Sequence, residues 1–124
     1  MSKRTVVGFL GAARLSFGMA LLLSPASTLR FLWPEEEASR PITSEIARAL
    51  GIRETVLGLG ILGALMGKGS PKPWLVASAA VDGADVALTL MNRFSFRHGA
   101  RLATFVAGPA TISLDLYLAF TLEE

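Results

Sequence analysis

The sequence predicts an all-α protein, a four-helix transmembrane bundle with up-and-down topology and a short interfacial helix between its first two long helices. Of its 124 residues, 52% are hydrophobic and 18% are charged, a balance more apolar than that of most soluble domains. Four long apolar segments each have the roughly 17 to 25 residues that cross ~30 Å of hydrocarbon. None alternates with a period of two, as a barrel strand would. We therefore expect residues 1–124 to form a single integral membrane domain.

The predicted long helices begin and end at turn or capping signals. The first follows Lys3 and Arg4 and carries Arg14 at its middle, which favours a retained helix over a cleaved signal peptide. Ser24 and Pro25 fit the N-cap and the first residue of the short interfacial helix. The four long helices are expected at about residues 5–23, 43–66, 73–91 and 99–122.

The remaining connections indicate how neighbouring helices run. Thr43 is expected to cap the second long helix. Residues 67–73 form a short polar turn before Trp74, which suits the membrane interface. Short turns favour antiparallel neighbours. An even number of spans places both termini on one side. The cations of the connections are divided between the two sides, and weighting those before the first helix predicts that the side of the termini is cytoplasmic. Lys3, Arg4, Lys68 and Lys72 fall on that side, and Arg30, Arg40, Arg93, Arg97 and Arg101 fall on the other.

Ionisable residues fall at or near the middle of every predicted span. An ionised side chain costs about 2.5 to 3.5 kcal/mol at the centre of a bilayer, so these residues cannot all face lipid. We expect them to point inward and to form one network, which we take as the candidate ligand or proton site. Its predicted members are Arg14, Arg48, Arg53, Glu54, Asp82, Asp85 and Asp115.

Two of these residues have matching surroundings with opposite charge. Arg14 and Glu54 each have a glycine three residues before and four residues after them, on the same face of the helix. Glycines let two backbones approach closely in a membrane. This pattern predicts an ion pair between Arg14 and Glu54.

The predicted network contains more acid than base. Three arginines face four carboxylates, which leaves a net charge of −1. We therefore expect at least one of Asp82, Asp85 and Asp115 to keep a proton near neutral pH or to share a cation. Three interpretations stay open: the network fixes helix register, moves a proton or cation, or binds a polar ligand.

Other motifs give little support to catalysis or to a cofactor. Residues 58–63 read G-x-G-x-x-G, but they lie inside a helix-length apolar segment and not between a strand and a helix. His98 is the only histidine and the chain has no cysteine, so we expect no metal site and no cofactor. The hydroxyl residues lack a nearby base, which predicts no catalytic residues.

Some residues point instead to lipid and protein contacts. Arg93, Arg97 and Arg101 recur every four residues and are expected to bind anionic lipid headgroups. Gly63 and Gly67 form a G-x-x-x-G motif, which predicts a close helix contact within the bundle or between protomers. The expected partners are therefore membrane lipids and a homo-oligomer or larger membrane complex. The net charge of only +2 gives no support to a nucleic-acid partner.

Three stretches resemble a family of small bacterial membrane proteins, common in actinobacteria, that carries a domain-of-unknown-function label. They are residues 18–25, residues 48–60 with the pattern R-x-x-G-x-R-E-x-x-x-G, and Trp74 followed by Asp82 and Asp85. In layout the chain also resembles DoxX-like four-helix membrane proteins, some of which are linked to redox or sulfur metabolism. Because the chain has no cysteine, it cannot perform thiol chemistry. The resemblance implies four helices with a charged core in a bacterial cytoplasmic membrane and implies no activity.

Three classes of function follow from these expectations. The first is a non-enzymatic accessory or structural subunit, which we favour. The second is a small proton- or cation-coupled transporter or channel. The third is a protein that binds a lipid or a quinone-type ligand in its polar interior.

Overall fold

The computed structural model describes residues 1–30, 41–67, 69–91 and 98–122, with the backbone alone for residues 42, 43, 89, 91 and 98–107. Throughout these ranges the regular elements are helices and there is no strand, so the all-α prediction is confirmed. The elements are α1 (Lys3–Leu23), α2 (Pro25–Leu29), α4 (Pro41–Met66), α5 (Lys72–Met91) and α6 (His98–Thr121).

The long helices end within two residues of their predicted bounds, but Thr43 is wrong as a cap and Ser24 caps α2 by position alone. Thr43 lies inside α4, because the helix already begins at Pro41. Proline suits a first helical position, where no N–H donor is needed. Ser24 does occupy the N-cap position of α2, but its side chain makes no capping hydrogen bond. Its backbone N–H instead bonds to the Ala20 carbonyl and closes α1.

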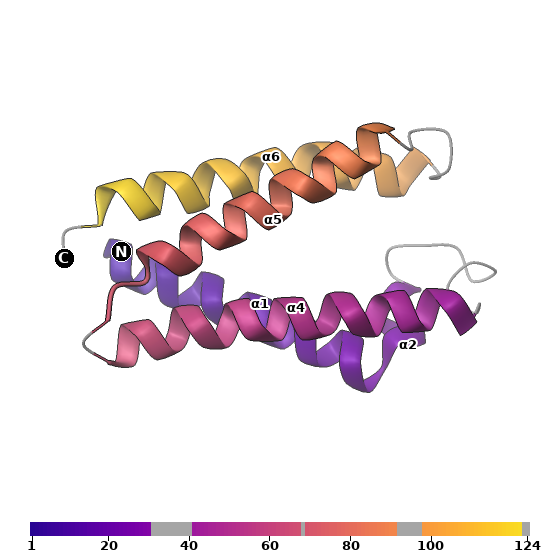
Figure 1. Cartoon of the computed structure of the whole chain (residues 1–124), viewed down its shortest axis with the longest axis horizontal. Helices are drawn as coiled ribbons and strands as arrows, with labels where there is room; N and C mark the ends of the chain where they lie inside the picture. The colour runs from indigo at the N-terminus through magenta and orange to yellow at the C-terminus, as the bar shows by residue number, and fades with distance from the viewer. Residues whose placement is uncertain (31–40, 68, 92–97, 123–124) are drawn as a thin grey trace.

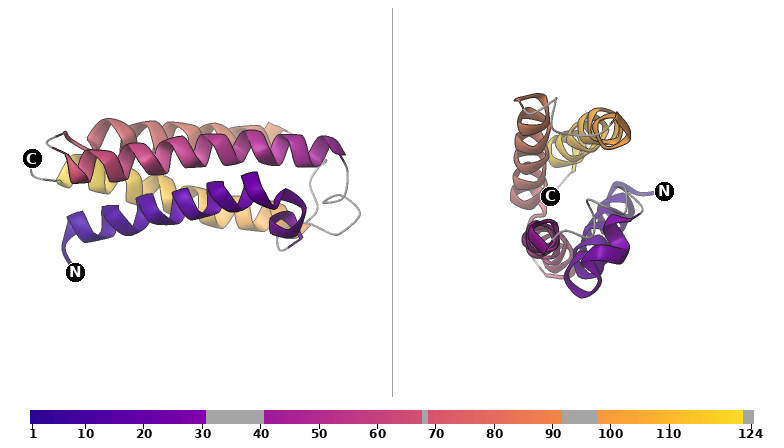
Figure 2. Two further views of the ribbon diagram at one scale, coloured as in Figure 1. Left: turned by 90° about the horizontal axis from the view of Figure 1, so that it is seen from below. Right: turned by 90° about the vertical axis from the view of Figure 1, so that its right-hand side faces the viewer.

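The four long helices form two antiparallel pairs. Helix α1 packs along α4, and α5 packs along α6. Figure 1 shows that the two pairs lie close together at the end that contains the N-terminus, the end of α6 and the α4–α5 turn, and that they diverge toward the opposite end. The end view in Figure 2 places α5 and α6 on one side and α1 and α4 on the other. Successive long helices thus alternate in direction.

Two apolar clusters hold this arrangement. The larger includes Val7, Ile61, Leu75 and Leu118, one from each long helix, and lies at the end where the pairs meet. The smaller joins α2 to the α1–α4 pair through Leu21, Leu29 and Ala47. Val7, Ile61 and Leu75 each lie seven residues, or about two turns, from a charged residue of the predicted network. The network therefore lies next to the four-helix apolar layer.

Two helical segments among the described residues are long and apolar enough to cross a membrane. They are Lys3–Leu23 and Ser44–Met66, judged by length and composition. Their apolar residues also lie on the outside of the molecule, as described below.

Candidate functional site

Glycines bring α1 and α4 into close contact on both sides of the predicted ion pair. A Cβ atom added at Gly18 would lie 2.7 Å from the Gly51 carbonyl oxygen, and one added at Gly58 would lie 2.8 Å from the Gly11 carbonyl oxygen. Both distances are too short for real atoms, so neither position has room for a side chain. The antiparallel register pairs Gly18 with Gly51 and Gly11 with Gly58. This register places the residues midway between the glycines, Arg14 and Glu54, opposite each other.

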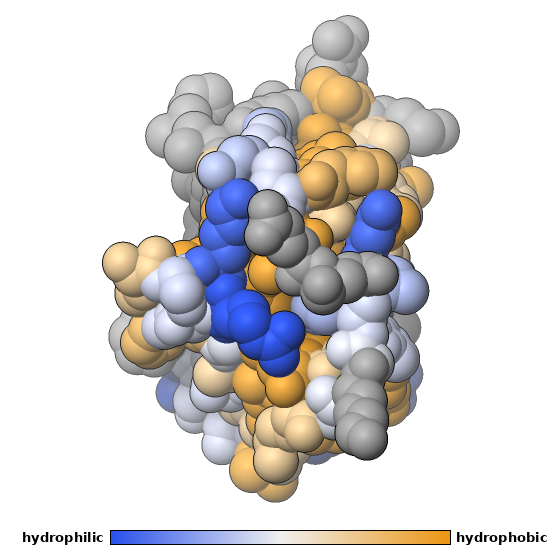
Figure 3. All heavy atoms as spheres, turned by 90° about the vertical axis from the view of Figure 1, so that its left-hand side faces the viewer, coloured by the Kyte–Doolittle hydropathy of each residue, from blue (hydrophilic) through white to orange (hydrophobic). Residues whose placement is uncertain are grey.

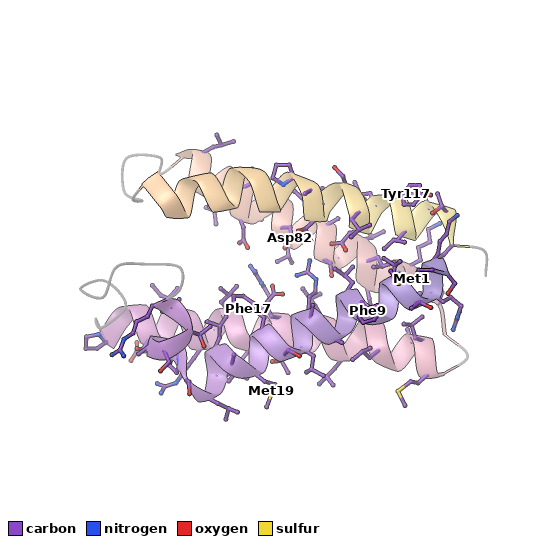
Figure 4. The ribbon with its side chains drawn as sticks, turned by 180° about the vertical axis from the view of Figure 1, so that it is seen from behind. Met1, Phe9, Phe17, Met19, Asp82 and Tyr117 are labelled. Carbon is purple, nitrogen blue, oxygen red and sulfur yellow. The ribbon has the colours of Figure 1, made fainter. Side chains whose placement is uncertain are left out.

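Arg14 contacts a carboxylate from each of the other three long helices. Its Nη1 donates a hydrogen bond to Glu54 Oε2 on α4 at 2.7 Å. Its Nη2 donates to Asp82 Oδ2 on α5 at 2.5 Å and to Asp115 Oδ2 on α6 at 3.2 Å. The predicted Arg14–Glu54 ion pair is confirmed. Figure 4 shows Asp82 on the α5–α6 pair, facing the α1–α4 pair.

A second arginine extends the cluster along α4 and α5. Arg53 Nη1 donates to Asp85 Oδ1 at 2.9 Å, and Arg53 Nη2 forms an ion pair with Asp85 Oδ2 at 2.8 Å. This fork-to-fork geometry is the strongest form of a charge-assisted hydrogen bond. Arg53 Nη2 also donates to Glu54 Oε1 at 2.9 Å. Glu54 therefore links the two arginines, since each of its oxygens accepts from one of them.

Burial differs across this group of six residues, which we call the charged cluster. Arg14 is 7% exposed, Glu54 5% and Asp115 0%. The side chains of Arg53 and Asp85 are 29% and 42% exposed. The cluster is thus buried around Arg14 and partly open around Arg53. Its members are Arg14, Arg53, Glu54, Asp82, Asp85 and Asp115.

Several buried polar atoms in and near the charged cluster find no hydrogen-bond partner among the described residues. Two belong to the guanidinium groups and two to hydroxyls, and the fifth is a carboxylate oxygen. A buried polar atom without a partner costs about 1 to 3 kcal/mol, so such atoms mark places where a proton, a water or a polar ligand fits. They are Arg14 Nε, Arg53 Nε, Thr55 Oγ1, Ser78 Oγ and Asp115 Oδ1.

One member of the predicted network lies elsewhere. The side chain of Arg48 is exposed on α4, so its assignment to the interior is wrong. Arg48 is six residues before Glu54, and a step of six residues turns a helix by about 240°. It therefore points away from the face that carries Glu54. Without Arg48 the charged cluster holds two cations and four carboxylates, a formal net charge of −2.

Other sequence predictions have different outcomes. Arg93 and Arg97 lie outside the described residues, as does the side chain of Arg101, so headgroup binding stays a prediction. The proposed close contact at Gly63 within the bundle is wrong, because an added Cβ there would meet no atom within 4 Å. A contact at Gly63 between protomers stays a prediction.

Two further contacts, which helical spacing did not predict, lie at the end where the helix pairs meet. Lys3 Nζ donates to the Thr121 carbonyl at the end of α6, and Arg4 Nη2 donates to the Leu65 carbonyl near the end of α4, both at 3.1 Å. Cations satisfy the free carbonyls that end a helix. The pair of cations at the start of α1 could have predicted these contacts. Because successive long helices alternate in direction, the start of α1 lies beside the carboxyl ends of α4 and α6.

The four carboxylates of the charged cluster all pair with arginines. Within the described ranges, no group of three or more His, Cys, Asp or Glu residues has the geometry to hold a metal ion. Each of the four carboxylates in the cluster already accepts a hydrogen bond from an arginine. The contacts given above for the cluster are therefore ion pairs between carboxylates and arginines.

Comparison with known proteins assigns no family. No family model, no curated protein and no solved structure matches this chain. Function is therefore inferred from the geometry of the charged cluster and from the apolar side chains on the outer surface.

Proposed function

We propose that this chain is a small integral membrane protein whose four long helices all cross the cytoplasmic membrane of a bacterium. In this proposal it acts as a non-enzymatic accessory or structural subunit, and the charged cluster fastens its two helix pairs together. The resemblance of residues 48–60 to a family of small bacterial membrane proteins points the same way.

The observation that carries the proposal is the inverted polarity of the molecule. The charged cluster is inside, while large apolar side chains point outward on all four long helices. Phe9 is 65% exposed on α1, Val56 50% on α4, Leu88 56% on α5 and Phe120 69% on α6. Met19 also points away from the other pair (Figure 4). Soluble monomers rarely expose apolar surface on every side, whereas a membrane protein must present it to lipid.

The proposed orientation follows from the weight given to the cations at the start of the first helix. Lys3 and Arg4 at the start of α1 and Lys72 at the start of α5 lie where the helix pairs meet. Figure 3 views this end and shows a hydrophilic patch beside apolar surface. Cytoplasmic ends of membrane proteins are enriched in Lys and Arg. We therefore place this end, with both termini, in the cytoplasm.

Single-cysteine labelling tests the membrane topology, and the absence of cysteine from the chain makes it free of background. We expect Ser2→Cys and Ser70→Cys to react with a membrane-impermeant maleimide from one side of sealed vesicles. Arg30→Cys and a cysteine introduced within 92–97 should react only from the other side. Val56→Cys should stay unlabelled until the membrane is dissolved and the protein denatured. Labelling of Val56→Cys in intact vesicles would contradict the proposal.

The accessory role requires a separate measurement. Native mass spectrometry after extraction in mild detergent reports bound lipid, stoichiometry and partner chains together. We expect the chain to leave the membrane with a second protein or with further copies of itself. A monomer that retains no partner under conditions that preserve other membrane complexes would contradict a subunit role and leave the topology result intact.

A further inference from the structure

The carboxylates of the charged cluster are unequally compensated, and Asp115 is the least compensated. Both oxygens of Glu54 accept from an arginine, and both oxygens of Asp85 pair with Arg53. Asp82 accepts from Arg14 at 2.5 Å. Asp115 accepts only a longer bond of 3.2 Å from Arg14, and its Oδ1 has no partner among the described residues although the residue is fully buried.

Asp82 and Asp115 also depend on the same donor atom. Both Oδ2 atoms bond to Arg14 Nη2, so the two carboxyl groups are held close to each other. Two ionised carboxylates at such short range repel strongly, and in a water-poor site one of them retains its proton. The single guanidinium already serves Glu54 through its Nη1, so it cannot neutralise both aspartates.

An unpartnered hydroxyl lies at the same level. Ser78 is fully buried and its Oγ has no partner among the described residues. It lies one helical turn before Asp82, on the same face of α5. Gly108 on α6 lies against Val86 on α5. The two helices are antiparallel, so the residue seven positions after Gly108, which is Asp115, lies level with position 79 of α5, seven positions before Val86. Asp115 therefore lies level with the turn between Ser78 and Asp82.

We infer that Asp115 binds a proton at neutral pH and forms, with Asp82 and Arg14, a proton-binding site at the junction of the four long helices. The groups that face Asp115 are Arg14 from α1, Glu54 from α4 and Asp82 from α5. The full burial of Asp115, together with Asp82 and Glu54, favours the protonated form, and Arg14 opposes it. The inference builds on the proposed membrane location, because water at the cluster would weaken the repulsion that retains the proton.

Infrared spectroscopy in lipid nanodiscs tests the site directly. With the aspartate carboxyl carbons isotopically labelled, the wild type at neutral pH should show the carbonyl stretch of a protonated aspartic acid. Asp115→Asn should remove this band, whereas the matched variant Asp85→Asn should retain it. Asp82→Asn should also remove it, since Asp115 then has Arg14 Nη2 to itself. A wild type without the band, or a band that survives Asp115→Asn, overturns the inference.

A second measurement needs no variant and so does not depend on a variant that folds. Denaturing the wild type in weakly buffered solution at neutral pH exposes Asp115 to water, so the chain should release about one proton. Release of none overturns the inference.

Replacing sodium and potassium by N-methylglucamine should leave the infrared band unchanged. A band that appears only after this replacement would assign the site to a small cation instead. The labelling test on the single-cysteine variants is read out separately, so these failures are distinct from failure of the membrane proposal.

Discussion

The two helix pairs carry opposite charge. At the level of the charged cluster the α1–α4 pair contributes Arg14, Arg53 and Glu54, a net charge of +1. The α5–α6 pair contributes three aspartates, a net charge of −3. Neither pair can neutralise its own interior, so each one needs the other. The contrast indicates that electrostatic attraction selects the partner pair, whereas apolar packing alone would accept any similar helices.

The pairs also differ in how they are built. A Cβ atom at Gly18, Gly51 or Gly58 would meet backbone atoms of the facing helix in the α1–α4 pair, whereas a Cβ atom at Gly108 on α6 would meet the side chain of Val86 on α5. Direct contacts between the pairs are concentrated at the apolar layer and the charged cluster. Close packing at the glycines holds α1 against α4, and the two pairs are joined by the apolar layer and by the ion pairs of Arg14 and Arg53 with the aspartates. This difference predicts which substitutions break the molecule into two halves.

Exchanging the charges of Arg14 and Glu54 should have the largest effect. The double variant Arg14→Glu with Glu54→Arg keeps opposite charges at positions 14 and 54, but it places a carboxylate beside Asp82 and Asp115. Removal of one partner from a buried ion pair costs about 3 to 5 kcal/mol, and we expect Arg14→Met to cost this much. The exchange should cost at least as much, because Arg14 serves three partners. The free energy of unfolding in detergent, followed by the fluorescence of Trp74 in a Trp33→Phe background, measures both.

Arg48→Met is the matched control for this comparison. It removes an arginine from an exposed position of α4, so its effect should stay within about 0.5 kcal/mol. Recovery of wild-type stability by the double exchange would show that Arg14 and Glu54 form an isolated pair, and it would contradict the central role of Arg14.

Much of the charged cluster could be predicted because helical spacing determines which residues share a face. The repeated glycine pattern around Arg14 and Glu54 depends only on this periodicity and on the size of glycine, and both are visible in the sequence. The cost of burying charge in a membrane then requires opposite charges to meet. These two constraints were sufficient for the Arg14–Glu54 pair.

The rest could not be predicted because it depends on how helices rotate and how far side chains reach. Nothing in the spacing says that one Arg14 nitrogen serves two aspartates, or that Arg53 takes Asp85 with both nitrogens. Arg48 was assigned to the interior by its depth alone, and the rotation of α4 places it outside. Thr43 failed as a cap because Pro41 is equally compatible with the first turn of a helix.

Filling the glycine contacts of α1 and α4 should have an intermediate effect. A Cβ atom at Gly18 would lie 2.6 Å from the Thr55 backbone nitrogen and 2.7 Å from the Gly51 oxygen, and backbone atoms cannot move aside. We expect Gly18→Ala to destabilise the protein by about 1 to 3 kcal/mol. Gly63→Ala, which meets nothing within 4 Å, should be neutral or stabilising by about 0.5 to 1 kcal/mol, because alanine favours a helix more than glycine does. Equal effects of the two substitutions in unfolding measurements would contradict close packing as the basis of this pair.

Replacing Arg53 by lysine should have the smallest effect of the three. Lysine keeps the charge but cannot donate two parallel hydrogen bonds to Asp85, so we expect a loss of about 1 kcal/mol. The loss is limited because Arg53 and Asp85 are 29% and 42% exposed, which lets other polar groups replace the missing bond. Arg14→Lys, at a position 7% exposed with three partners, should cost several times more. The ratio of the two losses in the free energy of unfolding measures how much more Arg14 contributes than Arg53 to the attachment of one helix pair to the other. A ratio near one would mean that the two arginines contribute equally to this attachment.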